Sequence, residues 1–274
     1  MSLNPFSAFR FVPLESVSGQ NWRRPPSFAF ASALTHLPLA DSELLQSSHH
    51  LPIVIAETED GLHVVTLLQA GLTRVPAVDE DGRWRRSYMP IALRCLPFRL
   101  ALPLGAVPKL EIAPELGIAP PDAQGAPLMT TADSLQADLQ PLASLLTRLE
   151  AGHRRLNLAA ERLFLAGALA KLEGIPTDKG RYLTVDPEAF ESLAPEHCAF
   201  LARDHFLPLD LVAACLFSRR LLTDAVARLT SAPKRTDPAD RSTIATEVND
   251  LLRHVNDVDM RIDDSELFSI DAFN

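Results

Sequence analysis

Two short runs of β-branched and apolar residues constrain the fold of this chain most strongly. They span residues 52–56 and 63–68, and Glu59-Asp60-Gly61 lies between them. Strand-forming runs on either side of a glycine-containing turn are typical of two antiparallel strands joined by a tight connection. The sequence therefore predicts a β-hairpin at residues 52–68.

Further strands are predicted on both sides of a proline-rich stretch. One is expected at residues 75–78, followed by the turn sequence Asp79-Glu80-Asp81-Gly82, and another within residues 91–104. Residues 105–130 contain five prolines and three glycines and are predicted to be loop or linker, with one short strand at 110–112. A strand is also expected later in the chain, at residues 181–185.

Helical periodicity begins after this loop. Leucines and Ala170 recur at steps of three, four and seven between residues 135 and 170, which predicts one long helix or two on a single apolar stripe. Gly152 is the expected kink and Gly174 the expected end. Asp186-Pro187 and Ala194-Pro195 each open a short helix, and a last core helix is predicted at residues 208–229.

These elements predict an α+β fold, with a small antiparallel sheet in the N-terminal half packed by helices from the C-terminal half. The main domain is expected at residues 1–230, strand-rich over 1–130 and helical over 131–230. Residues 231–242 are read as a polar linker, and residues 243–274 as a C-terminal helix with an acidic tail. That tail can dock on its own domain or on a partner; its composition permits either.

Composition narrows the functional classes. The formal net charge is -9 and the pI is about 5.4, so the chain lacks the basic footprint of nucleic-acid binding. No run of eighteen uncharged apolar residues occurs, so no membrane insertion is expected. Three distant cysteines, Cys95, Cys198 and Cys215, indicate reduced thiols and a cytoplasmic protein, and the last two are expected to be buried. No nucleotide or metal motif is found, so no cofactor is predicted.

One segment resembles a known family. Leu51-Pro52-Ile53-Val54-Ile55 is followed by Asp81-Gly82-Arg83-Trp84, then Tyr88-Met89-Pro90, and then Arg94-Cys95-Leu96-Pro97-Phe98. The order and spacing of these residues resemble the SapC family of bacterial proteins, and the likeness extends over roughly residues 27–230. The resemblance implies a connection with surface-layer protein transport and brings no agreed catalytic residues. Cys215 stands where the family usually has a histidine.

Arginine and aromatic residues in the same segment form the first candidate site, a ligand-binding one: Arg83, Trp84, Arg85, Tyr88 and Arg94. Guanidinium groups bind carboxylates or phosphates, and a tryptophan offers a stacking face, so the group can hold a peptide or an anion. The alternative is structural: Trp84 and Tyr88 anchor the core while the arginines pair with the acidic residues 79–81.

Histidines and a carboxylate form a weaker candidate for a metal site, comprising His36, Glu43, His49 and His50. These are ligand types for zinc or non-haem iron, although their spacing matches no metal-binding motif. The leading expectation for function is therefore a non-enzymatic binding or accessory protein with a protein or peptide partner. The alternative is a metal-dependent oxygenase or hydrolase that acts on peptides or amino-acid derivatives.

Overall fold

The structure is a computed structural model of the chain. It describes residues 6, 8–101, 109–119, 125–128, 139–175, 181–203 and 205–230. The chain divides into two units, Met1–Ala232 and Pro233–Asn274. The second unit, the predicted linker at 231–242 and the predicted tail at 243–274 lie outside the described residues.

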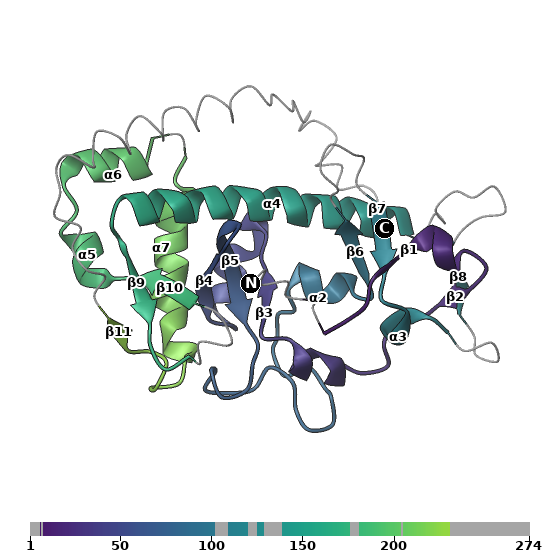
Figure 1. Cartoon of the computed structure of the whole chain (residues 1–274). Helices are drawn as coiled ribbons and strands as arrows, with labels where there is room; N and C mark the ends of the chain where they lie inside the picture. Colours follow the sequence, from purple (N-terminus) through teal and green to yellow (C-terminus); the bar gives the residue numbers. More distant parts are fainter. Residues whose placement is uncertain are drawn as a thin grey trace, which may run out of the picture. The chain divides into compact units, whose positions relative to one another are not determined.

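A six-stranded antiparallel sheet forms the centre of the first unit (Figure 1). Its spatial order is β11 (Leu229–Thr230), β9 (Leu169–Leu172), β10 (Arg181–Val185), β4 (Ile53–Thr58), β5 (Gly61–Leu67) and β3 (His36–Pro38). Strands β4 and β5 are the predicted hairpin, and Gly61 takes the φ of 128° that its turn requires. The α+β class is confirmed. The sheet is larger than the N-terminal hairpin because three strands from the C-terminal half join it.

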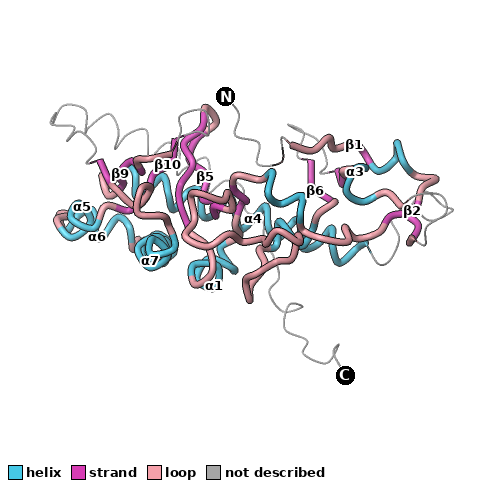
Figure 2. Tube along the Cα trace, turned by 90° about the horizontal axis from the view of Figure 1, so that it is seen from below, coloured by secondary structure: helices cyan, strands magenta, loops and turns pink. Residues whose placement is uncertain are grey.

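Both faces of this sheet are covered, which explains why its central strand is apolar at consecutive positions. Ile53 and Ile55 point to the face packed by helices α4 (Gln140–Leu165) and α7 (Leu207–Ser218). Val54 and Ala56 point to the opposite face, where they pack with Leu172, Tyr182 and Leu222. Figure 2 shows α7 and α1 (Leu44–Ser48) on one side of strands β10 and β5.

Helix α4 is one uninterrupted helix, so the alternative of two helices is wrong. Gly152 lies inside it, where a Cβ atom would come within 2.6 Å of Asp41 Oδ1, so the glycine permits close packing there. The helix ends well before the predicted Gly174. Gly167 adopts a φ of 74°, the left-handed conformation that ends many helices. The residues from Leu169 to Leu172 then form β9.

A second, three-stranded sheet has the order β1-β7-β6. It contains β1 (Val12–Pro13), β7 (Lys109–Ile112) and β6 (Phe98–Ala101). Strand β7 confirms the short strand predicted at 110–112. The strand predicted within residues 91–104 is only partly present, because helix α2 (Ile91–Cys95) occupies its first half. The strand predicted at 75–78 is wrong: that segment carries only a single bridge, from Val78 to Trp84.

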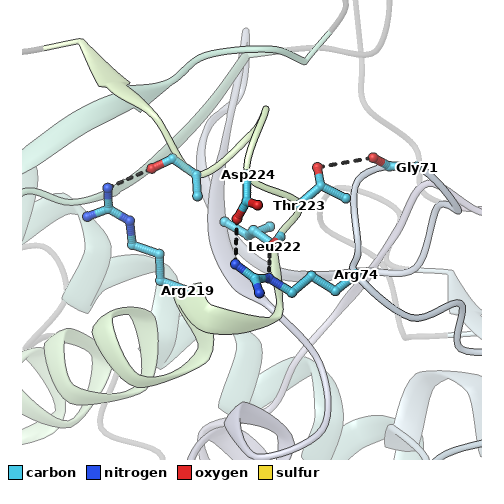
Figure 3. A network of polar contacts seen from close by, with 7 residues as sticks. Gly71, Arg74, Arg219, Leu222, Thr223 and Asp224 are labelled. Atoms are coloured by element: carbon cyan, nitrogen blue, oxygen red, sulfur yellow. Dashed lines mark hydrogen bonds and ion pairs between the residues drawn. The ribbon is translucent and has the colours of Figure 1, made fainter.

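The predicted last helix also ends early. Helix α7 stops at Ser218, and a 3-10 turn, η6 (Arg219–Leu221), follows. Side chains then tie the next residues to the loop after β5, as Figure 3 shows. Arg74 Nε donates to the Leu222 carbonyl at 2.9 Å, and Thr223 Oγ1 donates to the Gly71 carbonyl at 3.2 Å. These contacts direct the chain back to the sheet, where it forms β11.

The remaining elements are short. Helices α5 (Pro187–Glu191) and α6 (Pro195–Leu201) begin where predicted, and the Asp186 carboxylate caps α5 by accepting from the Glu188 and Ala189 amides. The others are α3 (Pro114–Gly117), the pair β2 (Asn21–Trp22) and β8 (Ala126–Pro127), and the 3-10 turns η1 (Leu14–Val17), η2 (Ala29–Ala33) and η3 (Asp41–Glu43).

Candidate functional site

The segment around Trp84 is shaped by a tight loop. Gly82 has a φ of 75°, and the Asp79 amide donates to the Arg83 carbonyl at 3.0 Å. Trp84 is half-buried and packs edge-on against Phe28, with ring centroids 6.3 Å apart. Its indole Nε1 donates to the Tyr88 carbonyl at 2.9 Å. Trp84 therefore anchors this loop in the core and positions Tyr88.

The arginines of the segment face different surroundings. Arg83 and Arg85 are exposed, and Arg85 lines a shallow surface hollow together with Asp79, Glu80 and Asp81. Within the part of the chain that the structure describes, Arg83, Arg85 and Arg94 form no ion pair. The pairing with residues 79–81 that the structural alternative expects is thus not seen among these residues.

A buried carboxylate organises the inner side of the site. Glu43 is only 2% exposed and accepts three hydrogen bonds. Its Oε1 accepts from the Ala40 amide at 2.9 Å, while its Oε2 accepts from the Tyr88 hydroxyl at 2.7 Å and the Ile91 amide at 2.8 Å. Burial raises the pKa of Glu43, and the three hydrogen bonds and the charge of Arg94 oppose that rise. Glu43 thereby joins η3, the Tyr88 segment and α2.

On the outer side, positive and aromatic groups gather around the Tyr88 ring. The Arg94 guanidinium lies 6.0 Å from its centroid, and the His50 ring stacks at 6.4 Å with an interplanar angle of 23°. Burial, His49 and Arg86 lower the pKa of His50, and burial and Arg85 lower the pKa of Arg86. We call Arg86, Tyr88, Arg94 and His50 the Tyr88 surface. Among the described residues, neither Arg86 nor Arg94 forms an ion pair, and the buried Glu43 is a carboxylate whose pKa the Arg94 charge lowers.

The four residues of the predicted metal site lie in two places. Glu43 and His50 both contact Tyr88, and His49 is the exposed residue that ends α1. His36 is buried elsewhere, on β3, where its Nδ1 lies 3.0 Å from the Tyr182 hydroxyl. Among the described residues, no group of three or more histidine, cysteine, aspartate or glutamate side chains is arranged to hold a metal ion.

His36 belongs instead to an internal histidine cluster that sequence reasoning missed. The His63 and His153 rings stack at 5.7 Å, and His153 Nδ1 lies 3.1 Å from the Leu39 carbonyl oxygen. Asn157 donates from Nδ2 to His63 Nδ1 at 3.2 Å and accepts from the Val64 amide. Burial and the neighbouring His63 lower the pKa of both His36 and His153 to about 4. No sequence spacing signals the cluster, because three separate elements contribute its histidines.

The three cysteines lie in different surroundings. All three are unpaired, and burial raises the pKa of Cys95 to about 11 and of Cys215 to about 12. Cys215 is buried as expected. The expectation for Cys198 is wrong: it is exposed, because α6 turns this residue away from the core.

The fold and the site define an α+β protein with a basic and aromatic surface supported by a buried glutamate. None of the described helices is both long enough and apolar enough to cross a membrane. Comparison with curated proteins and with solved structures finds no match. The SapC family model matches residues 18–224, which is most of the chain. The chain therefore belongs to the SapC family.

Proposed function

We propose that this chain is a non-enzymatic binding protein whose segment 83–94, with Arg83, Trp84, Arg85, Tyr88 and Arg94, holds an anionic peptide or small anion. The observation that carries the proposal is the absence, among the described residues, of any ion pair for Arg94 beside the Tyr88 ring. A carboxylate brought to this surface would gain charge-assisted hydrogen bonds that the protein itself does not make.

These residues have different roles in the proposed site. Glu43 and the indole of Trp84 fix the position of Tyr88 from within, through hydrogen bonds of 2.7 Å and 2.9 Å. Arg94 is exposed, so its guanidinium borders the surface, whereas Arg86 is half-buried and donates from Nη2 to the Val75 carbonyl. Arg85 contributes less free charge, because three acidic residues share its hollow.

The wider role in the proposal is that of an accessory protein in the cytoplasm that takes part in the export or handling of bacterial surface proteins. The family resemblance supports that role, and three unpaired cysteines support the compartment. No observation in the described residues favours the metal-dependent oxygenase or hydrolase, since its four residues lie in two places.

The test is the binding of fluorescein-labelled triglutamate to the full chain, measured by fluorescence anisotropy at low and at high ionic strength. We expect the double variant Arg86→Gln/Arg94→Gln to bind about tenfold or more weakly than the wild type. The matched control is Arg154→Gln/Arg203→Gln, which removes two exposed arginines elsewhere. Equal affinity of the wild type and the Arg86→Gln/Arg94→Gln variant, both shown to be folded by circular dichroism, would rule the site out.

A further inference from the structure

The Tyr88 surface continues across α1 to the end of α7. The His50 ring lies 6.4 Å from the His49 ring, and His49 lies 4.6 Å from the Phe217 ring. The Arg220 guanidinium then lies 3.8 Å over Phe217. We call this continuous series the cation–aromatic strip; it consists of Arg94, Tyr88, His50, His49, Phe217 and Arg220. An arginine stands at each end of it.

The middle of the strip exposes apolar surface. Phe217 is 40% exposed, and Leu45 is 53% exposed. Leu45 precedes His49 by four residues, at the spacing that places two side chains on one helix face. Large apolar side chains exposed beside charged groups are typical of the centre of a protein interaction surface.

Charge identifies what the strip can bind. The chain as a whole carries a formal charge of -9, yet neither Arg94 nor Arg220 forms an ion pair among the described residues. Among the described residues, the carboxylate that accepts a hydrogen bond from a strip side chain is that of Glu43, which is buried and has three donors. A ligand that brings its own carboxylates therefore complements both ends.

The spacing of the strip fits an extended peptide. Its first three steps, of 6.0, 6.4 and 6.4 Å, are close to the roughly 6.6 Å between alternate residues of a β-strand. Side chains at alternate positions of such a peptide point the same way, so acidic and apolar residues can meet successive groups of the strip.

We propose that the cation–aromatic strip binds an extended acidic segment of a partner protein, with carboxylates at Arg94 and Arg220 and an apolar side chain on Phe217 and Leu45. This inference rests on the proposed function for its Arg94 end. It adds the Phe217 and Arg220 end and names the ligand as a linear acidic–apolar peptide.

The experiment compares two fluorescein-labelled peptides on the full chain. Triglutamate has no apolar side chain for Phe217 and Leu45 and is the probe of the Tyr88 end, whereas a longer peptide with alternating glutamate and leucine offers groups for both ends. We expect Phe217→Ser/Arg220→Gln to weaken binding of the longer peptide about tenfold or more and to leave triglutamate unchanged. The matched control is Phe206→Ser/Arg203→Gln, because Phe206 is 67% exposed and lies at the opposite end of α7.

The outcomes separate this inference from the proposed function. If the longer peptide binds the wild type and the Phe217→Ser/Arg220→Gln variant equally while triglutamate still binds, the inference fails and the Tyr88 site stands. If neither peptide binds the wild type, both proposals fail. If light scattering shows a dimer that Phe217→Ser/Arg220→Gln dissociates, a second copy occupies the strip and the peptide ligand is overturned.

Discussion

Histidines gather in two regions of this protein, and their surroundings give them different roles. His36 is buried and His63 and His153 are half-buried on β3, β5 and α4, where a phenol, an amide and a carbonyl each lie against one ring nitrogen. His49 and His50 lie at the end of α1, beside aromatic rings and arginines on the surface. The internal cluster makes hydrogen bonds within the fold, whereas Arg94 of the surface group forms no ion pair among the described residues.

Glu43 shows how a buried acid can lie beneath a basic surface. Its carboxylate accepts hydrogen bonds from the Ala40 amide, the Tyr88 hydroxyl and the Ile91 amide. It fixes the Tyr88 ring without neutralising the guanidinium groups on the exposed side through an ion pair. A buried acid can therefore support a basic surface, because hydrogen-bond donors of the main chain take up its lone pairs.

The largest effect is expected from removing that carboxylate. In Glu43→Ala, the amides of Ala40 and Ile91 and the Tyr88 hydroxyl lose their acceptor inside the protein. We expect the free energy of unfolding to fall by about 3–5 kcal/mol, measured by urea denaturation. Glu43→Gln should lose less, since its carbonyl oxygen still accepts.

The control for this prediction is Glu80→Ala, which removes an exposed carboxylate from the hollow beside Arg85. It should change the free energy of unfolding by no more than about 0.5 kcal/mol. Equal stability of Glu43→Ala and Glu80→Ala would show that Glu43 does not hold the Tyr88 surface in place.

The internal cluster predicts a smaller, pH-dependent effect. His36 and His153 have a folded pKa of about 4, below the ordinary value of 6.5, so the unfolded chain binds more protons between those two values. Each histidine should therefore reduce stability as the pH falls from about 6.5 to about 4, by about 1–3 kcal/mol. His153→Gln should show a shallower loss over this range than the wild type.

Urea denaturation midpoints measured between pH 6.5 and about pH 4 test whether stability falls with the pH, as predicted. His205→Gln serves as the control, because His205 is exposed and lies outside the cluster. Identical pH profiles for the wild type and His153→Gln would mean that His153 is not held neutral by the fold.

Local sequence signals predicted the elements that depend on local chemistry. These elements are the hairpin β4–β5, the strand β10 and the Asp186 cap of α5. Each depends on residues that are close together in the sequence, namely turn residues, strand-forming residues or a capping residue. Helix α4 ends at Leu165, two residues before Gly167, yet the seven-residue step from Leu163 to Ala170 continues the apolar stripe beyond it. That match is accidental: Ala170 is buried in β9 by the sheet rather than by a helix.

Only one part of the candidate site could be predicted from the sequence. The residue types of segment 83–94 could be recognised because they are close in sequence. Phe217 and Arg220 could not, because only the packing of α1 against α7 brings them to His49. The same applies to Glu43, whose residue type, together with three histidines, suggested a metal ligand, whereas its actual partners are a phenol and two amides.

The smallest expected effect separates the Tyr88 ring from its hydroxyl. Tyr88→Phe removes one donor to Glu43 and keeps the ring between Arg94 and His50. Because the Ile91 amide still donates to the same oxygen, we expect the unfolding free energy to fall by only about 1 kcal/mol. Binding of triglutamate should stay within about twofold of the wild type, since the ring and the guanidinium groups remain.

Tyr182→Phe makes the same chemical change in the internal cluster, where the hydroxyl lies 3.0 Å from His36 Nδ1. It should change the pH profile of stability and leave triglutamate binding unaltered. The two variants therefore compare the loss of the same hydroxyl group from the surface ring of Tyr88 and from the buried ring of Tyr182. If Tyr182→Phe weakened triglutamate binding as much as Arg86→Gln/Arg94→Gln does, the histidine cluster and the Tyr88 surface would be coupled. The Tyr182 hydroxyl is buried, so it could affect the surface only through the sheet.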